Sequence, residues 1–88
     1  MRHESRDINK IAKVFQEFSK STDLANFLVA IFTLDELKQL NSRLKIIQEL
    51  KKETPQQRIA KKLGVGVATV TRGSKVLQNP RFKNINWG

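Results

Sequence analysis

The apolar residues in the first half of the chain recur at steps of three and four positions, which is the period of one face of a helix. Over residues 7–19 this stripe predicts a first helix, whose apolar face is formed by Ile8, Ile11, Ala12, Phe15 and Phe18. Behind candidate cap residues at positions 21–23, the same period predicts a second helix through Leu24, Phe27, Leu28 and Ile31. The apolar run at residues 27–32 also fits a buried strand, but no other segment alternates as a partner strand does, so the helix is favoured.

Two further helices are predicted from the signals at their starts. Thr33 and Glu36 have the spacing of a capping box, in which each side chain accepts a hydrogen bond from the other residue's backbone N–H. The third helix should be the longest, because its apolar stripe continues through Leu34, Leu37, Leu40, Leu44, Ile47 and Leu50. Thr54 is the candidate cap of a short fourth helix, with Pro55 at its first position and Gln57 closing a second capping box.

Residues 56–72 have the spacing of a helix-turn-helix. A small residue, Ala60, stands where the second helix crosses close to the first, and Gly64 can adopt the left-handed conformation that ends the first helix. The apolar wedge between the two helices is predicted to consist of Ile59, Val65 and Val70. A purely structural helical hairpin is the alternative to a DNA-binding element.

The charge distribution favours the DNA-binding interpretation. The 88 residues carry a net charge of +9, and nine of the 17 Lys and Arg lie in residues 51–88, where Glu53 is the one acidic residue. A cluster of this kind is typical of a surface that faces a polyanion, whereas a basic surface kept for solubility is the alternative. A basic module that coats nucleic acid without sequence preference also fits the charge.

Composition excludes several other classes of protein. With no Cys, disulfides and thiolate metal sites are excluded, and the single histidine, His3, lies near a terminus that we expect to fray. No metal site and no catalytic triad is therefore expected, and the chain is predicted not to be an enzyme. No apolar run is long enough for a membrane span and the N-terminus does not read as a signal peptide, so a cytoplasmic protein without a membrane partner is expected.

The chain is predicted to form one all-α domain over residues 1–88. Residues 7–52 should form the core and dimerisation helices, and residues 54–78 the helix-turn-helix. The run at residues 27–32 is apolar on every side of its helix, and a chain this short cannot cover it from its own surface. An obligate homodimer follows as a prediction.

The predicted DNA contacts lie on both helices of the helix-turn-helix. The second helix presents its N-terminal residues to base edges in the major groove, namely Gly66, Val67, Ala68, Thr69 and Thr71. Further contacts are expected from the preceding helix, at Gln57, Arg58 and Lys61. Because none of the base-facing residues is an Arg, Asn or Gln, recognition is expected to be partly water-mediated and partly indirect.

Three segments together resemble the bacterial Trp repressor family. They are residues 68–74 (Ala-Thr-Val-Thr-Arg-Gly-Ser), residues 33–36 (Thr-Leu-Asp-Glu) and the pair Ser42-Arg43, within a likeness that runs from about residue 30 to 77. The resemblance implies an intertwined, all-helical homodimer that binds a DNA operator as a transcriptional repressor of the bacterial nucleoid. It also implies that L-tryptophan is the corepressor, bound beneath the recognition helices, and that no other cofactor is needed.

The same resemblance suggests the residues that bind the effector. Arg43 and Arg72 would sandwich the indole and hold the carboxylate, Thr33 would assist the carboxylate, and Gly73 would leave room beside the ring. Val76 stands where well-known members carry a serine near the ligand's amino group, which permits a regulator that works without tryptophan. A surface cation at Arg43 and a phosphate contact at Arg72 are the alternatives.

The C-terminal segment departs from the family pattern. Residues 79–88 are too short for a full closing helix, so part of the dimer interface is expected to be either missing or replaced by Phe82, Ile85 and Trp87.

Overall fold

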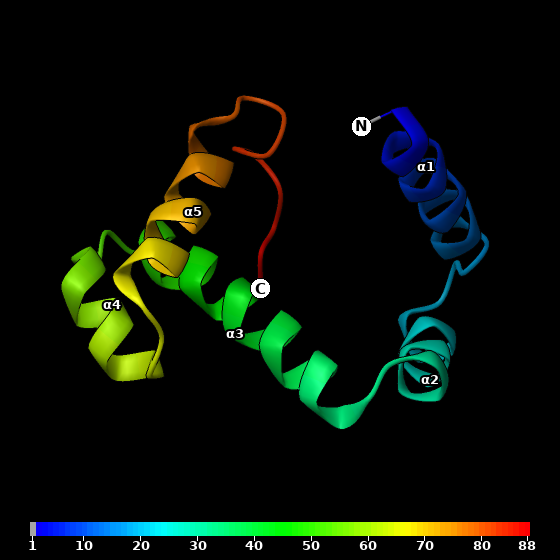
Figure 1. Ribbon diagram of the computed structural model, residues 1–88, viewed down its shortest axis with the longest axis horizontal. Coiled ribbons are helices and arrows are strands. Elements are labelled where there is room, and N and C mark those ends of the chain that lie inside the picture. Colours follow the sequence, from blue (N-terminus) through cyan, green and yellow to red (C-terminus); the bar gives the residue numbers. More distant parts are fainter. Residues whose placement is uncertain (1) are drawn as a thin grey trace. The chain divides into compact units, whose positions relative to one another are not determined.

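A computed structural model describes the backbone of residues 2–88 and the side chains of residues 5–88, so the side chain of His3 lies outside the described part. Five α-helices follow one another: α1 (Arg2–Gln16), α2 (Ser21–Ile31), α3 (Leu34–Lys51), α4 (Gln56–Leu63) and α5 (Val67–Gln78) (Figure 1). No strand occurs among residues 2–88, so the all-α prediction is confirmed.

The chain divides into two compact units between Leu37 and Lys38. The first unit contains α1, α2 and the first turn of α3, and the second contains the rest of α3 together with α4, α5 and the C-terminal segment. The single domain predicted from the sequence stays a prediction.

Aromatic contacts join the two helices of the first unit. Phe15 of α1 meets the ring of Phe27 edge-on at a centroid distance of 5.9 Å, and Phe18 stacks on the same ring at 4.9 Å. Helix α1 ends at Gln16, three residues before the predicted end, so Phe18 reaches Phe27 from the connecting turn. None of the described residues of α2 is buried, which leaves apolar surface exposed on this unit.

The start of α2 differs from the prediction, whereas the start of α3 agrees with it. The cap residues predicted at positions 21–23 are already helical. Lys20 is at the cap position, and its side chain makes no capping hydrogen bond. At α3, Thr33 N–H donates to Glu36 Oε1 (2.8 Å) and Glu36 N–H donates to Thr33 Oγ1 (3.1 Å), which confirms the capping box. The hydrogen bond from the Thr33 backbone lowers the pKa of Glu36.

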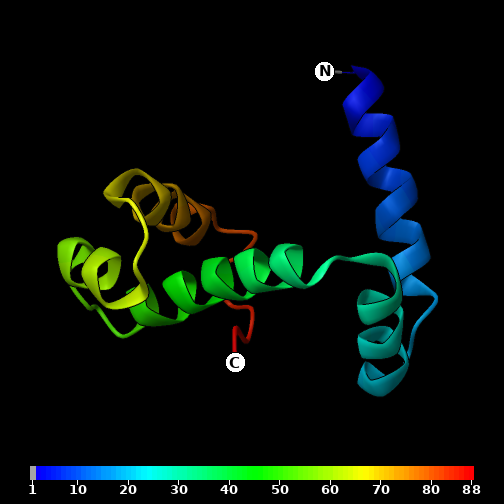
Figure 2. The ribbon, with the colours of Figure 1, turned by 60° about the horizontal axis from the view of Figure 1, so that its bottom comes forward.

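Three helices share the core of the second unit. Ile46 of α3, Ile59 and Ala60 of α4, and Val70 of α5 are buried together, and the partly buried side chains packed against them are Leu50, Leu63 and Val65. Figures 1 and 2 show α4 and α5 side by side against the C-terminal half of α3. The wedge predicted from the sequence, Ile59, Val65 and Val70, is confirmed as part of this core.

The second predicted capping box is wrong. Helix α4 begins at Gln56 with Pro55 at the cap position, and no side chain caps it. Thr54 instead donates its hydroxyl to Glu49 Oε1 at 3.2 Å, because that carboxylate lies within reach at the end of α3. Lys62 Nζ binds the same oxygen at 3.3 Å and is the main reason that the pKa of Glu49 is lowered.

The C-terminal segment folds back onto α3 without forming a helix (Figure 1). Lys51 Nζ donates to the Lys83 carbonyl at 3.3 Å, and Gln48 Nε2 donates to the Trp87 carbonyl. The Trp87 indole N–H donates to the Phe82 carbonyl at 3.3 Å. The expected lack of a full closing helix is therefore confirmed, while a role of this segment in a dimer interface stays a prediction.

Candidate functional site

Helices α4 and α5 form the helix-turn-helix that the spacing predicts. Gly64 ends α4 in the left-handed conformation (φ 66°, ψ 37°), where a side chain would be strained. Val65 N–H then donates to the Ala60 carbonyl at 3.0 Å, which closes the turn. Gly66 is extended (φ −74°, ψ 151°), and α5 begins at the next residue. Ile59 and Val70, both fully buried, fix the crossing of the two helices.

The residues predicted to contact DNA lie on the outside of this element. Gln57, Arg58 and Lys61 are exposed on α4, Gly66 is exposed in the turn, and Val67, Ala68 and Thr71 are exposed at the start of α5. The eighth residue, Thr69, is half-buried because it faces α3 and lines a cavity there. The eight residues are accessible to different degrees, and their contact with DNA stays a prediction.

Gln56, which was not predicted to contact DNA, lies beside Thr71. The Thr71 hydroxyl is 2.9 Å from Gln56 Oε1 and 3.0 Å from the Val67 carbonyl, so it donates its one proton to either. The residue predicted from the sequence to contact DNA was the neighbouring Gln57. One signal in the sequence could have pointed to Gln56. It is an amide side chain at the start of α4, the helix that precedes α5.

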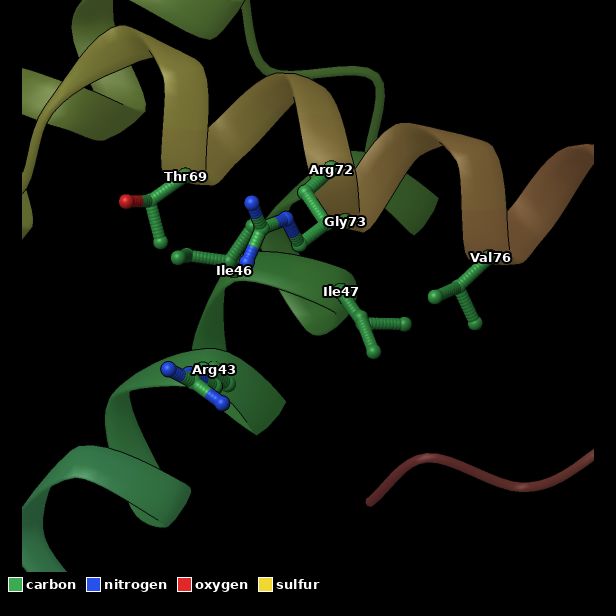
Figure 3. Close-up of a pocket in the computed structure, with 7 residues that line it drawn as sticks. All are labelled: Arg43, Ile46, Ile47, Thr69, Arg72, Gly73 and Val76. Atoms are coloured by element: carbon green, nitrogen blue, oxygen red, sulfur yellow. The ribbon is translucent and has the colours of Figure 1, made fainter. Parts of the chain in front are cut away.

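A cavity of about 160 Å³ opens between α3 and α5 (Figure 3). Its lining residues come from both helices and are Arg43, Ile46, Ile47, Thr69, Arg72, Gly73 and Val76. Figure 3 shows the Arg72 guanidinium on the α5 side, next to Ile46, and the Arg43 guanidinium on the α3 side, with Ile47 and Val76 further along the cavity. The structure thus brings together four of the five residues predicted to bind an effector.

Gly73 allows the two helices to approach closely at this cavity. A Cβ atom placed on Gly73 would lie 2.8 Å from Ile46 Cγ2, which is shorter than any ordinary carbon–carbon contact. The glycine expected to leave room beside a ligand therefore also leaves room for a buried isoleucine of α3.

A second, more polar cavity of about 290 Å³ continues along α3. It shares Arg43, Ile46 and Thr69 with the first cavity and adds Lys38, Gln39, Ser42 and Val65. Both cavities have cationic and neutral linings without a carboxylate. A ligand with a flat apolar part and an anionic group fits this chemistry, because a guanidinium both stacks on rings and donates to carboxylates.

The fifth predicted effector residue, Thr33, belongs to the other unit. Its hydroxyl accepts the Glu36 N–H in the capping box, and its part in binding a ligand stays a prediction. Over the described part of the chain, no helix is long and apolar enough to cross a membrane, and no group of three acidic, histidine or cysteine side chains is placed to hold a metal ion.

The chain is similar to known transcription regulators over most of its length. The family described as Trp repressor protein matches residues 6–85. A "Trp operon repressor homolog" of Vibrio parahaemolyticus is 38% identical over 77 residues, covering 86% of this chain and 75% of that protein. A protein of the same name from Xylella fastidiosa is 32% identical over 75 residues, covering 84% and 82% of the two chains. No solved structure gives a significant match.

Proposed function

This chain belongs to the Trp repressor family of transcription regulators, and we propose that it is a sequence-specific DNA-binding repressor that L-tryptophan activates as a corepressor. The observation that carries the proposal is the cavity directly behind the recognition helix α5, with one arginine from α3 and one from α5. This arrangement joins a ligand site to a DNA-reading element through one helix.

The DNA-binding part of the proposal has α5 in the major groove. Its exposed N-terminal residues, Val67, Ala68 and Thr71, meet base edges, while Arg58 and Lys61 of α4 bind phosphates. Phosphate contacts supply most of the affinity, and the small side chains of α5 touch thymine methyl groups or hold bridging waters.

The ligand part of the proposal uses the two arginines. An indole ring lies between the guanidinium planes of Arg43 and Arg72, and the carboxylate of the amino acid accepts their N–H groups. Because Thr69, Arg72, Gly73 and Val76 lie on one face of α5, a ligand in the cavity fixes that helix against α3. A tenfold rise in operator affinity requires the ligand to favour the DNA-competent arrangement by about 1.4 kcal/mol.

A homodimer is part of the proposed function. In the first unit Val29, Ile31 and Leu34 are 69%, 57% and 70% exposed, which is unfavourable in water unless another chain covers them. A two-fold dimer carries two recognition helices about 34 Å apart, so its operator is a palindrome with half-sites one DNA turn apart.

Val76 favours a second candidate, a family regulator that acts without tryptophan. Its apolar side chain lines the cavity, and no lining residue carries a carboxylate for the ammonium group of an amino acid. Under this alternative the cavity binds another ligand or none, and DNA binding is independent of tryptophan.

Calorimetric titration with L-tryptophan tests the ligand part. We expect saturable heat with the wild-type protein and none with Arg72→Ala, while Arg81→Ala, an exposed arginine outside the cavity, should bind as the wild type does. If the wild-type protein gives no heat at millimolar tryptophan, the tryptophan-independent regulator is the better account. Equal affinity of the protein for unrelated DNA duplexes would instead favour a nonspecific basic module.

A further inference from the structure

The base-facing start of α5 lacks a side chain that can form two hydrogen bonds with one base. Its exposed side chains there belong to Val67, Ala68 and Thr71, and none of them has an amide or a guanidinium. An amide nevertheless stands beside them, because the first residue of α4, Gln56, reaches across to α5.

The contact between Gln56 and Thr71 fixes that amide on the DNA-facing side of the element. Thr71 is exposed and lies one turn after Val67, and its hydroxyl is 2.9 Å from Gln56 Oε1. Gln56 is half-buried, and its side-chain amide is hydrogen-bonded to an exposed partner. A side chain that is already restrained loses less conformational entropy when it binds.

The hydrogen-bonding groups of the Gln56 amide that Thr71 does not use match those of adenine. Oε1 has two lone pairs, of which Thr71 takes one when its proton is directed at Gln56 and not at the Val67 carbonyl, and Nε2 keeps both of its donors. A free lone pair beside a free N–H matches the N6 donor and N7 acceptor that adenine shows in the major groove.

We propose that Gln56 is a specificity-determining residue that recognises an adenine in the major groove, and that Thr71 positions its amide. This assignment rests on the sequence-specific DNA binding proposed above. Gln78, an exposed glutamine at the end of α5, is not hydrogen-bonded to Thr71 and serves as the matched control.

Selection from DNA duplexes with a randomised central segment, in the presence of L-tryptophan, tests this assignment. The wild-type protein should select a palindromic motif with an adenine at one position of each half-site. Gln56→Ala should lower the preference at that position about tenfold and leave the other positions unchanged. Gln56→Glu keeps an acceptor for Thr71 but loses the N–H donors, so its preference should move from adenine to cytosine, whose N4 group is a donor.

Three further variants separate base reading from a structural role. Thr71→Val removes the hydroxyl with little change of shape and should weaken the same preference, and Thr71→Ser should retain it. The control variant Gln78→Ala should leave the motif intact. Thermal unfolding of each variant, followed by circular dichroism, shows whether the helices are retained.

Two results would overturn the assignment while leaving the proposed function in place. One is a motif unchanged by Gln56→Ala, and the other is an equal loss of affinity for every sequence, which is the mark of a phosphate contact. Failure of the wild-type protein to select any motif would instead contradict the proposed function itself, and the role of Gln56 with it.

Discussion

Gly73 lies in the middle of α5 and faces Ile46 and Leu50 of α3. A methyl group added there would lie 2.8 Å from Ile46 Cγ2 and 3.5 Å from Leu50 Cδ1. Ile46 is almost completely buried, so its methyl group has little space into which it can move. The variant Gly73→Ala therefore has two opposite effects on stability. Alanine is a better helix former than glycine, but its methyl group clashes with the core.

The clash should be the larger effect. Ordinary carbon–carbon contacts lie at about 3.5–4.0 Å, so the helices must separate by about 0.7 Å or Ile46 must leave its rotamer. Overpacking of this kind costs about 1–3 kcal/mol, whereas replacing an unhindered glycine in a helix by alanine stabilises by about 1 kcal/mol. We expect Gly73→Ala to lower the free energy of unfolding by about 1 kcal/mol.

Urea unfolding followed by circular dichroism measures this difference as a shift in the midpoint at constant slope. Ile46→Leu removes the β-branch that carries Cγ2 while keeping the side-chain volume, so it is the partner for a double-mutant cycle. In the Ile46→Leu background, Gly73→Ala should be about 1 kcal/mol less destabilising than in the wild type. A Gly73→Ala protein that is more stable than the wild type by about 1 kcal/mol would show that α3 and α5 do not approach each other as described.

Three other predictions concern pH, salt and assembly. The pKa of Glu49 is lowered chiefly by Lys62, so the ionised carboxylate of Glu49 contributes to stability above its ordinary pKa of 4.5. This contribution is lost as the pH falls through the lowered pKa. Over this pH range, Glu49→Gln should lose less of its free energy of unfolding than the wild type does, as measured by acid unfolding. If a dimer neutralises about six phosphates, a plot of the logarithm of the DNA affinity against the logarithm of the salt concentration should have a slope near −5. A slope shallower than about −2 would refute the claim that the basic side chains of residues 51–88 bind the DNA phosphates. Sedimentation should show a dimer at micromolar concentration, which Val29→Asp disrupts by placing a charge on the exposed apolar surface of α2; a folded wild-type monomer would contradict the assembly.

Local signals in the sequence predicted those parts of the fold that depend on neighbouring residues. The capping box of Thr33 and Glu36 and the left-handed Gly64 form within one turn of the chain, so spacing and residue type suffice to identify them. The cap predicted at Thr54 failed because its hydroxyl found Glu49, an acceptor on the preceding helix that a local pattern does not reveal. The start of α2 was also misplaced, since Ser21 is helical and needs no side-chain cap.

The candidate site shows the same limit. Arg43 and Arg72 line one cavity because of the way α3 packs against α5. The spacing of residues along the chain does not determine how these two helices pack. Only the resemblance to a family pointed to the pair beforehand. The contact between Gln56 and Thr71 was missed for a related reason, because it joins residues 15 positions apart on two different helices.

The dependence of DNA affinity on L-tryptophan tests the central claim most directly. Fluorescence anisotropy of a labelled duplex that carries the selected palindrome, titrated with the wild-type protein at fixed salt, gives the affinity with and without the amino acid. Affinity should rise at least tenfold with saturating L-tryptophan in the wild type and remain unchanged in Arg72→Ala. Equal affinity with and without tryptophan in the wild-type protein would contradict the account.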